Sequence, residues 1–152
     1  MAQERISIIP AVFLFLKDND RLLMSRRYNT GYCDGFYSFI AGHVEENETF
    51  REAMVRETNE EAGIIVKSNE LKVVHVTHRY VPDEKNRIDI FMTVDTWQGE
   101  VRNMECHKCD HIGWFSENDL PNNTIPYIKH AILQINSGVF YSEFGFEDHI
   151  GQ

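Results

Sequence analysis

Seven glutamates and two arginines fall within residues 42–64, GHVEENETFREAMVRETNEEAGI, so this stretch carries a net charge of −5 (two minus seven) in a chain of formal net charge −9. Glu57, Glu60 and Glu61 are spaced i, i+3 and i+4. On a helix this spacing brings three carboxylates to one edge. Like charges this close repel, so they need basic partners or hard divalent cations that prefer oxygen ligands. The spacing therefore predicts a metal site, with a solvated acidic helix face as the alternative.

The intervals around these glutamates form a longer pattern. Gly42 is followed after five residues by Glu48, and after seven more by RETNEEAGI, residues 56–64. This pattern resembles the signature of Nudix hydrolases, in which Gly, Glu and the run Arg-Glu-apolar-x-Glu-Glu-x-Gly-apolar stand at the same intervals. Two positions differ, since Thr58 stands where an aliphatic residue is usual and Ile40 replaces a frequent proline. Neither change removes a carboxylate, and flanking runs such as RIDIFM and PYIKHAI also look like a bacterial, MutT-like subgroup.

The resemblance implies a fold, a reaction and a cofactor. The fold is an α/β/α sandwich with a mixed β-sheet between helices, and the reaction is hydrolysis of a nucleoside diphosphate linked to another moiety. By the family pattern, Glu57, Glu60 and Glu61 would bind Mg²⁺ or Mn²⁺, with the carbonyl of Gly42 as a further ligand. Arg56 is interpreted as an internal partner that orients the glutamates. Divalent ions suit a pyrophosphate because they neutralise its charge, polarise a P–O bond and lower the pKa of a bound water.

The general base must lie within hydrogen-bond reach of the attacking water, and the family takes it from this helix or from a later loop. Glu105, in the segment NMECHKCD, is the loop candidate, and an exposed loop acid is the alternative. Arg27 and Arg79 stand at the ends of predicted strands, where they could reach phosphates or be plain surface charges. The segment CHKCDH, residues 106–111, lacks a second ligand pair at zinc-site spacing, so we do not interpret it as a zinc site.

The elements that must position these residues follow from periodicity and turn chemistry. Apolar runs at residues 6–16 and 21–27 predict a hairpin across the turn KDND, and a short aromatic strand is expected at residues 36–40. Thr49 is expected to cap a helix that is stopped by Gly63, because a glycine just past the last turn commonly ends a helix.

The rest of the chain predicts two longer strands, one short strand, an amphipathic helix and an aromatic tail, at residues 71–81, 87–97, 111–115, about 124–136 and 139–146. The tail is expected to pack on the rest of the chain, although it could also cover a nucleobase or a dimer partner. Together the elements predict a mixed sheet with helices on both faces, an α/β/α layering.

Length and composition limit the class of protein. With 152 residues and 42% apolar content, the chain can close one sizeable core, so we expect a single domain over residues 1–152. A pI near 5.2 disfavours a nucleic acid held on a broad basic face. No apolar run approaches the ~20 residues of a membrane span, and the N-terminus lacks the pattern of a signal peptide. Three cysteines fit a reducing compartment, so we expect a cytoplasmic protein.

The leading functional hypothesis is a metal-dependent pyrophosphohydrolase whose substrate is a small nucleotide, a nucleoside triphosphate or a nucleotide sugar. The alternative is a non-catalytic nucleotide-binding sensor module with the same fold. The intact glutamates oppose this alternative, because a pure binding module does not need every metal ligand. A calcium buffer would need an EF-hand loop, whose spacing is missing here. Dimers are common in the family, so a homodimer stays open, although no apolar stripe marks an interface.

Overall fold

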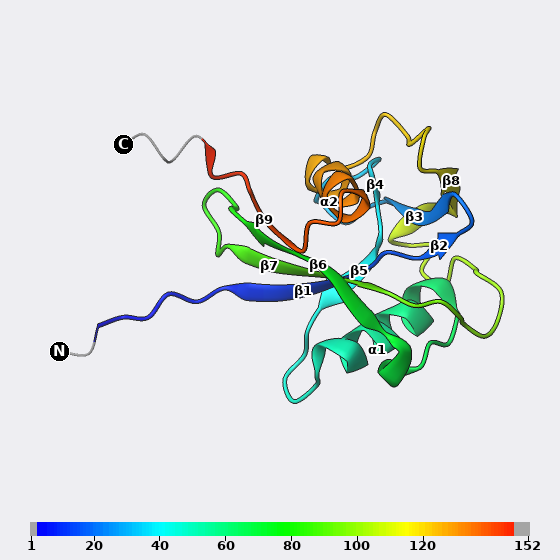
Figure 1. Ribbon diagram of the computed structural model, residues 1–152, viewed down its shortest axis with the longest axis horizontal. Helices are drawn as coiled ribbons and strands as arrows, with labels where there is room; N and C mark the ends of the chain where they lie inside the picture. Colours follow the sequence, from blue (N-terminus) through cyan, green and yellow to red (C-terminus); the bar gives the residue numbers. More distant parts are fainter. Residues whose placement is uncertain (1–2, 148–152) are drawn as a thin grey trace.

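The computed structural model describes residues 3–147, which form two β-sheets with α-helices packed on either side (Figure 1). The elements are, in chain order, β1 (Ile9–Leu14), β2 (Lys17–Asp18), β3 (Arg21–Arg27), β4 (Tyr37–Ser38), β5 (Ile40–His43), α1 (Phe50–Ala62), a 3₁₀ turn (Ser68–Glu70), β6 (Lys72–Arg79), β7 (Arg87–Thr93), β8 (Cys109–Ser116), α2 (Pro126–Asn136) and β9 (Tyr141–Phe144). This arrangement confirms the predicted mixed α/β layering, with the strands divided between two sheets.

The larger sheet is mixed and has the strand order β5-β1-β7-β6-β9. β1 lies antiparallel to β5 and parallel to β7, while β6 lies antiparallel to β7 and parallel to β9. The smaller sheet is antiparallel, and in it β3 pairs with β2, β4 and β8. The two parallel pairs join segments far apart in sequence, so the centre of the larger sheet depends on long-range contacts.

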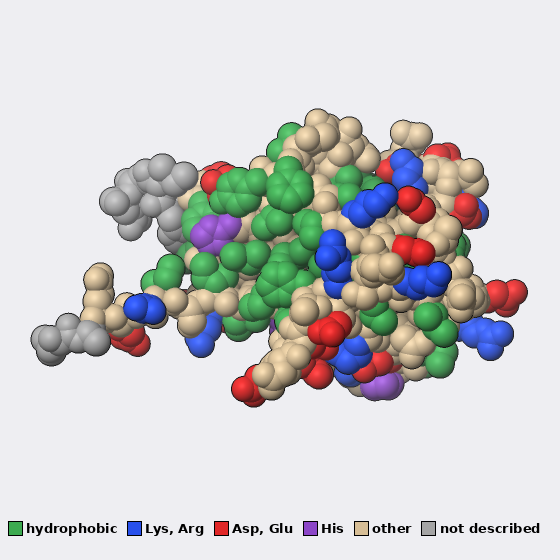
Figure 2. Space-filling model, turned by 60° about the horizontal axis from the view of Figure 1, so that its bottom comes forward, with side chains coloured by type: hydrophobic (Ala, Val, Ile, Leu, Met, Phe, Trp, Pro, Cys, Tyr) green, Lys and Arg blue, Asp and Glu red, His purple; other side chains and the backbone are tan. Residues whose placement is uncertain are grey.

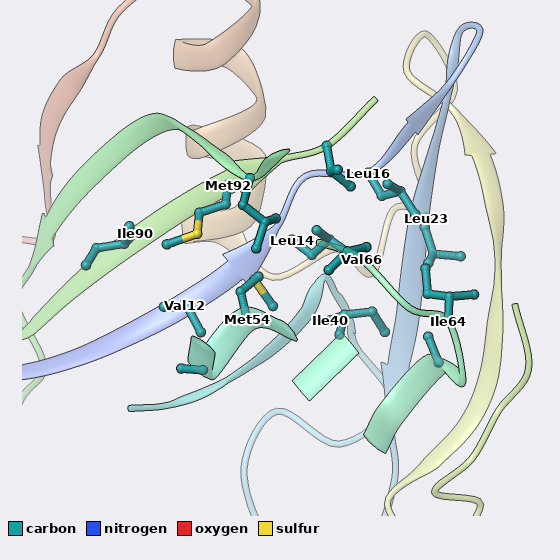
Figure 3. Close-up of a cluster of buried hydrophobic side chains, with 14 residues drawn as sticks. Val12, Leu14, Leu16, Leu23, Ile40, Met54, Ile64, Val66, Ile90 and Met92 are labelled. Atoms are coloured by element: carbon teal, nitrogen blue, oxygen red, sulfur yellow. The ribbon is translucent and has the colours of Figure 1, made fainter. Parts of the chain in front are cut away.

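Alternate residues of the central strands supply two separate hydrophobic cores. On β1, Val12 and Leu14 point into the core beneath α1, and Ala11 and Phe13 point into the core beneath α2. Figure 3 shows the first core, where Met54 of α1 meets side chains from the central strands. Side chains on a strand alternate between its two faces, so a strand buried on both sides must be apolar throughout. β1 meets this requirement over its buried length.

The predicted hairpin between residues 6–16 and 21–27 is wrong for most of its length. β1 pairs with β5 and β7, and only the short β2 forms a hairpin with β3, through a turn at Asn19, whose φ is +56°. The chain changes sheets between Phe15, whose N–H donates to the carbonyl of Met92, and Leu16, whose carbonyl accepts from Leu23. A strand apolar on both faces is more stable at the centre of a sheet than in an edge hairpin.

Two other segments also differ from their predicted forms. The aromatic run at residues 36–40 divides into β4 in the smaller sheet and the start of β5 in the larger one. The aromatic tail does pack on the rest of the chain, and it does so partly as the strand β9, whose Phe144 lies against Tyr127 and His130 of α2. The two helices begin and end within two residues of their expected bounds.

Hydrophobic side chains also gather on the surface of the half of the molecule that carries both ends of the chain (Figure 2). Among the exposed large apolar residues, Ile6 keeps 88% of its surface, Leu133 67% and Phe140 59%. Neither α-helix in the described part of the chain has the length and apolar character needed to span a bilayer.

Candidate active site

The helix α1 holds its acidic residues in place because both of its ends are capped. The side chain of Thr49 accepts a hydrogen bond from the N–H of Glu52, and the Glu52 carboxylate accepts one from the N–H of Thr49, which completes a capping box. Gly63 ends the helix in the left-handed conformation, with φ +68°, and donates to the carbonyl of Asn59. The apolar face of α1 is buried, so the opposite edge, with its glutamates, faces a cavity.

Arg56 is the cationic centre of this edge. Its guanidinium donates to both carboxylate oxygens of Glu48 at 2.7 and 3.1 Å, to Glu57 at 2.7 Å and to Glu60 at 3.4 Å. It also donates to the backbone carbonyl of His43 at 3.1 Å. The hydrogen bond to Glu48 is the main cause that raises the pKa of Arg56, so the residue stays charged. A fixed guanidinium orients the carboxylates around it.

Glu61 is the most strongly perturbed carboxyl group of the site. It accepts a hydrogen bond of 3.1 Å from the backbone N–H of Ala41, yet its pKa is raised to about 8, mainly by burial and to a lesser extent by the charges of Glu57 and Glu105. Burial also raises the pKa of Glu57, although Arg56 opposes this shift. Carboxyl groups kept this far from water favour a proton or a metal cation as their partner.

Gly42 of β5 lies directly against the carboxylate of Glu57. A Cβ atom added at this position would overlap the side-chain atoms of Glu57, so no other residue type fits without displacing that carboxylate. The backbone of β5 and the acidic edge of α1 therefore form one surface.

Glu105 reaches the same surface from the turn that precedes β8. The backbone carbonyl of Glu105 accepts hydrogen bonds from the N–H groups of Lys108 and Cys109, and its N–H donates to the side chain of Asn103. Its side chain lines the same cavity as Glu57 and Glu61, and its charge raises the pKa of both. The structure thus brings together the acids that the sequence separates by more than 40 residues.

One open cavity of about 600 Å³ is lined by five glutamates and by basic side chains that include Arg27, Arg56 and Lys108. The glutamates are Glu45, Glu57, Glu60, Glu61 and Glu105. Within residues 3–147, no three carboxylate, imidazole or thiol side chains lie in positions from which they could together bind one metal ion without moving. The site nevertheless fits a divalent cation, because its donors are hard oxygen ligands and two of the carboxyl groups are poorly hydrated.

Arg27 and Arg79, both predicted to bind substrate, lie in different surroundings. Arg27 lines the glutamate cavity and a neighbouring cavity, and it donates to the carbonyl of Tyr32 at 2.6 Å. Arg79 lines only the second cavity, where it is 8% exposed and forms a two-bonded ion pair with Asp89 at 2.5 and 3.1 Å. Its guanidinium also stacks on Tyr127, 3.8 Å from the ring centre. The interpretation of Arg79 as a plain surface charge is therefore excluded.

The second cavity has a volume of about 330 Å³ and adjoins the first. Residues that line both cavities include Arg27, Ser38, Gly42 and His43. The residues predicted for the site did not include Tyr32, Asp89 or Tyr127, which form or support this cavity. Only Asp89 had a local signal in the sequence. The alternation of apolar residues in RIDIFM places Asp89 on the face of the strand that points away from the core beneath α1.

Comparisons with known proteins agree on one family. The family model described as NUDIX domain matches residues 8–134. The chain is similar to the NAD-capped RNA hydrolase NudC of Klebsiella pneumoniae, with 31% identity over 116 residues, 75% of this chain and 41% of that protein. It is also similar to the protein of the same name from Chromobacterium violaceum, with 29% identity over 128 residues, 84% of this chain and 45% of that protein. The chain thus spans less than half the length of these two relatives.

The fold is similar to that of a solved structure, the MutT NUDIX hydrolase from Burkholderia pseudomallei. The TM-score is 0.77 and the sequence identity 21%, and the match covers 84% of this chain and 98% of that chain.

Proposed function

The chain belongs to the Nudix hydrolase family, and we propose that it hydrolyses the pyrophosphate bond of a nucleoside diphosphate derivative with the help of a divalent cation. The observation that carries this proposal is the group of five glutamates around one cavity, in which Glu57 and Glu61 are poorly hydrated. Nucleoside triphosphates and nucleotide sugars are the first substrates to test, because the cavity is open and polar.

In this proposal, Glu57, Glu60, Glu61 and the carbonyl of Gly42 hold Mg²⁺ or Mn²⁺. When bound, such a cation neutralises phosphate charge and makes a bound water easier to deprotonate. Arg56 acts as a positioning residue, since its hydrogen bonds to the glutamates fix where their oxygens lie.

Glu105 and Arg27 complete the proposed machinery. Glu105 acts as the general base, because it lines the same cavity as Glu57 and Glu61 but is carried by the turn before β8 and not by α1. Arg27 contacts a phosphate, since it stands where the two cavities meet. Arg79 supports the binding of the remainder of the substrate from the second cavity. We further propose that the protein works in the cytoplasm, where its three free cysteines would persist as thiols.

The substrate panel that tests this proposal contains nucleoside triphosphates, nucleotide sugars, NAD and an NAD-capped RNA, each with Mg²⁺ and with Mn²⁺. The last two are included because two relatives are named for hydrolysis of NAD-capped RNA. The expected result is metal-dependent release of phosphate, pyrophosphate or a nucleoside monophosphate that is lowered at least ~100-fold in Glu61→Gln. Tight nucleotide binding without turnover on any member would instead support the sensor module. Sedimentation of the same samples would establish whether the chain dimerises.

A further inference from the structure

The second cavity has the size and the walls of a site for a planar ring. Its volume of about 330 Å³ is near the lower end of the range for small-molecule sites. Ala11, Phe13 and Ala41 give it an apolar floor, and Tyr32 and Tyr127 contribute aromatic rings. Because it opens beside Gly42 and Arg27, a substrate whose pyrophosphate lies among the glutamates would place its next group here.

The two tyrosines are held in place from both sides. The loop that carries Tyr32 is tied together by Asp34, whose carboxylate accepts from the N–H groups of Thr30 and Gly31. Arg27 donates to the carbonyl of Tyr32 and lies over its ring at 5.3 Å, whereas Tyr127 is covered by the guanidinium of Arg79. The hydroxyl groups of Tyr32 and Tyr127 interact with each other. These walls are therefore preorganised before a ligand binds.

Hydrogen-bond donors outnumber acceptors among the side chains that line this cavity. Arg79 uses its Nε and Nη2 atoms for Asp89, so Nη1 has no acceptor within the described chain. Arg27 likewise uses Nε and Nη2 and keeps Nη1. The only lining carboxylate in residues 3–147 belongs to Glu84, and it is already bonded to Arg87. A ligand group that offers acceptors would find partners, whereas an amino group would find few.

The charges of this cavity are largely neutralised, which argues against a second phosphate as its occupant. Arg79 is compensated by Asp89 and Arg87 by Glu84, so Arg27 is the one lining arginine among the described residues without a carboxylate partner. A doubly charged phosphate away from the metal site would need more positive charge than this. Neutral carbonyl oxygens on an aromatic ring match both the donors and the apolar floor.

We propose that the second cavity selects nucleobases that present an exocyclic oxygen, such as hypoxanthine, guanine and uracil, over those that present an amino group at the same position, such as adenine and cytosine. The proposal rests on the proposed function, since it assumes that the pyrophosphate of a nucleotide lies among the glutamates. Arg79 is the specificity-determining residue, because it lines the cavity and its Nη1 can meet a carbonyl oxygen. Tyr32 is a positioning residue, because its ring lines the same cavity and its hydroxyl interacts with Tyr127.

The test measures binding of inosine and adenosine monophosphates by isothermal titration calorimetry in the presence of Mg²⁺. These two ligands share the ribose and phosphate and carry an oxygen and an amino group, respectively, at position 6 of the purine. We expect inosine monophosphate to bind at least ~10-fold more tightly, because the amino group would leave buried donors unpaired. Uridine over cytidine monophosphate should repeat the preference. Equal affinities, a preference for adenosine, no measurable binding of inosine monophosphate, or equally tight binding of ribose 5-phosphate would overturn the proposal.

Two variants locate the preference in this cavity. Tyr32→Phe keeps the ring but removes the hydroxyl that interacts with Tyr127, which lies under the guanidinium of Arg79, so it should lower the inosine-to-adenosine affinity ratio by ~3-fold or more. Tyr28→Phe makes the same change on an exposed tyrosine of the same loop that does not line the cavity, and it should leave the ratio unchanged. An unaltered ratio in Tyr32→Phe would remove Tyr32 from the assignment.

Hydrolysis of inosine and adenosine triphosphates distinguishes failure of this inference from failure of the proposed function. Hydrolysis of both at equal kcat/KM, with equal monophosphate affinities, would leave the enzyme assignment standing and overturn the base preference. Selective binding of inosine monophosphate without hydrolysis of any substrate would support the base preference and overturn the proposed enzymatic function.

Discussion

Replacing Glu61 by glutamine should make the metal-free protein more stable while it removes the activity. The pKa of Glu61 is raised by burial from 4.5 to about 8. A carboxyl group whose pKa rises on folding must either keep its proton in the folded state or be charged in a poorly hydrated place. Its contribution to stability is therefore complete below about pH 4.5 and is lost as the pH rises from about 4.5 to about 8. Glutamine carries no charge at any of these pH values, so the variant does not lose stability in this way.

The magnitude follows from the size of the shift. A difference of about 3.5 pKa units corresponds to about 5 kcal/mol at a pH above both values, at ~1.4 kcal/mol per unit. Residual solvent contact and an amide group without a full set of partners reduce this gain, so we expect about 2–3 kcal/mol at pH 8.5. For a chain of this size that corresponds to a rise in Tm of roughly 4–12 °C.

The assay is thermal unfolding in EDTA from pH 5 to pH 9. The Tm difference between Glu61→Gln and the unmodified protein should be small at pH 5 and should grow until about pH 8. Glu60→Gln, which changes a half-exposed carboxylate on the same helix, serves as the control and should show little pH-dependent gain. Addition of Mg²⁺ should raise the Tm of the unmodified protein more than that of Glu61→Gln, because the cation stabilises only the folded state that holds it. A Glu61→Gln protein that melts no higher than the unmodified one at pH 8.5 would refute the reasoning.

Three further changes test other parts of the structure. Gly42→Ala should lower kcat/KM at least ~10-fold and weaken the rise in Tm caused by Mg²⁺, because the added Cβ overlaps the carboxylate of Glu57; an unchanged Mg²⁺ response would contradict the close approach of β5 to α1. Asp89→Ala should reduce the free energy of unfolding, measured in urea, by about 3–5 kcal/mol, since it leaves Arg79 buried without its counter-ion; a loss below ~1 kcal/mol would show that the pair is hydrated. Glu105→Gln should depress kcat far more than KM, and less severely than Glu61→Gln; if it keeps the normal kcat while Glu57→Gln abolishes turnover, the general base lies on the helix.

Features that depend on neighbours in the sequence could be predicted before the fold was known. The helix α1 follows from Thr49 and Gly63, which act on backbone groups no more than four residues away. The shared edge of Glu57, Glu60 and Glu61 follows from 3.6 residues per turn. The alternation of apolar residues likewise identified the long strands β6 and β7, with every end within four residues of its predicted position.

Strand pairing could not be predicted in the same way. Residues 6–16 and 21–27 are adjacent and apolar, which favours a hairpin, yet β1 pairs with β7, 78 residues further on (Ile9 with Arg87). An apolar strand can be buried in either arrangement, and only the competition among all strands for the centre of the sheet decides between them. Local periodicity carries no information about that competition.

The sequence by itself therefore determined the carboxylates, their spacing and the family, because each of these is written in one short stretch of chain. Three other features come from the packing of distant segments: Glu105 lines the same cavity as this stretch, burial raises the pKa of Glu61, and Arg79 is buried between Asp89 and Tyr127. The physical reason is that hydration and pairing depend on which distant segments pack around a group. The residue type sets the chemistry that is available to a side chain. The surroundings of the side chain in the fold set its charge state and its interaction partner.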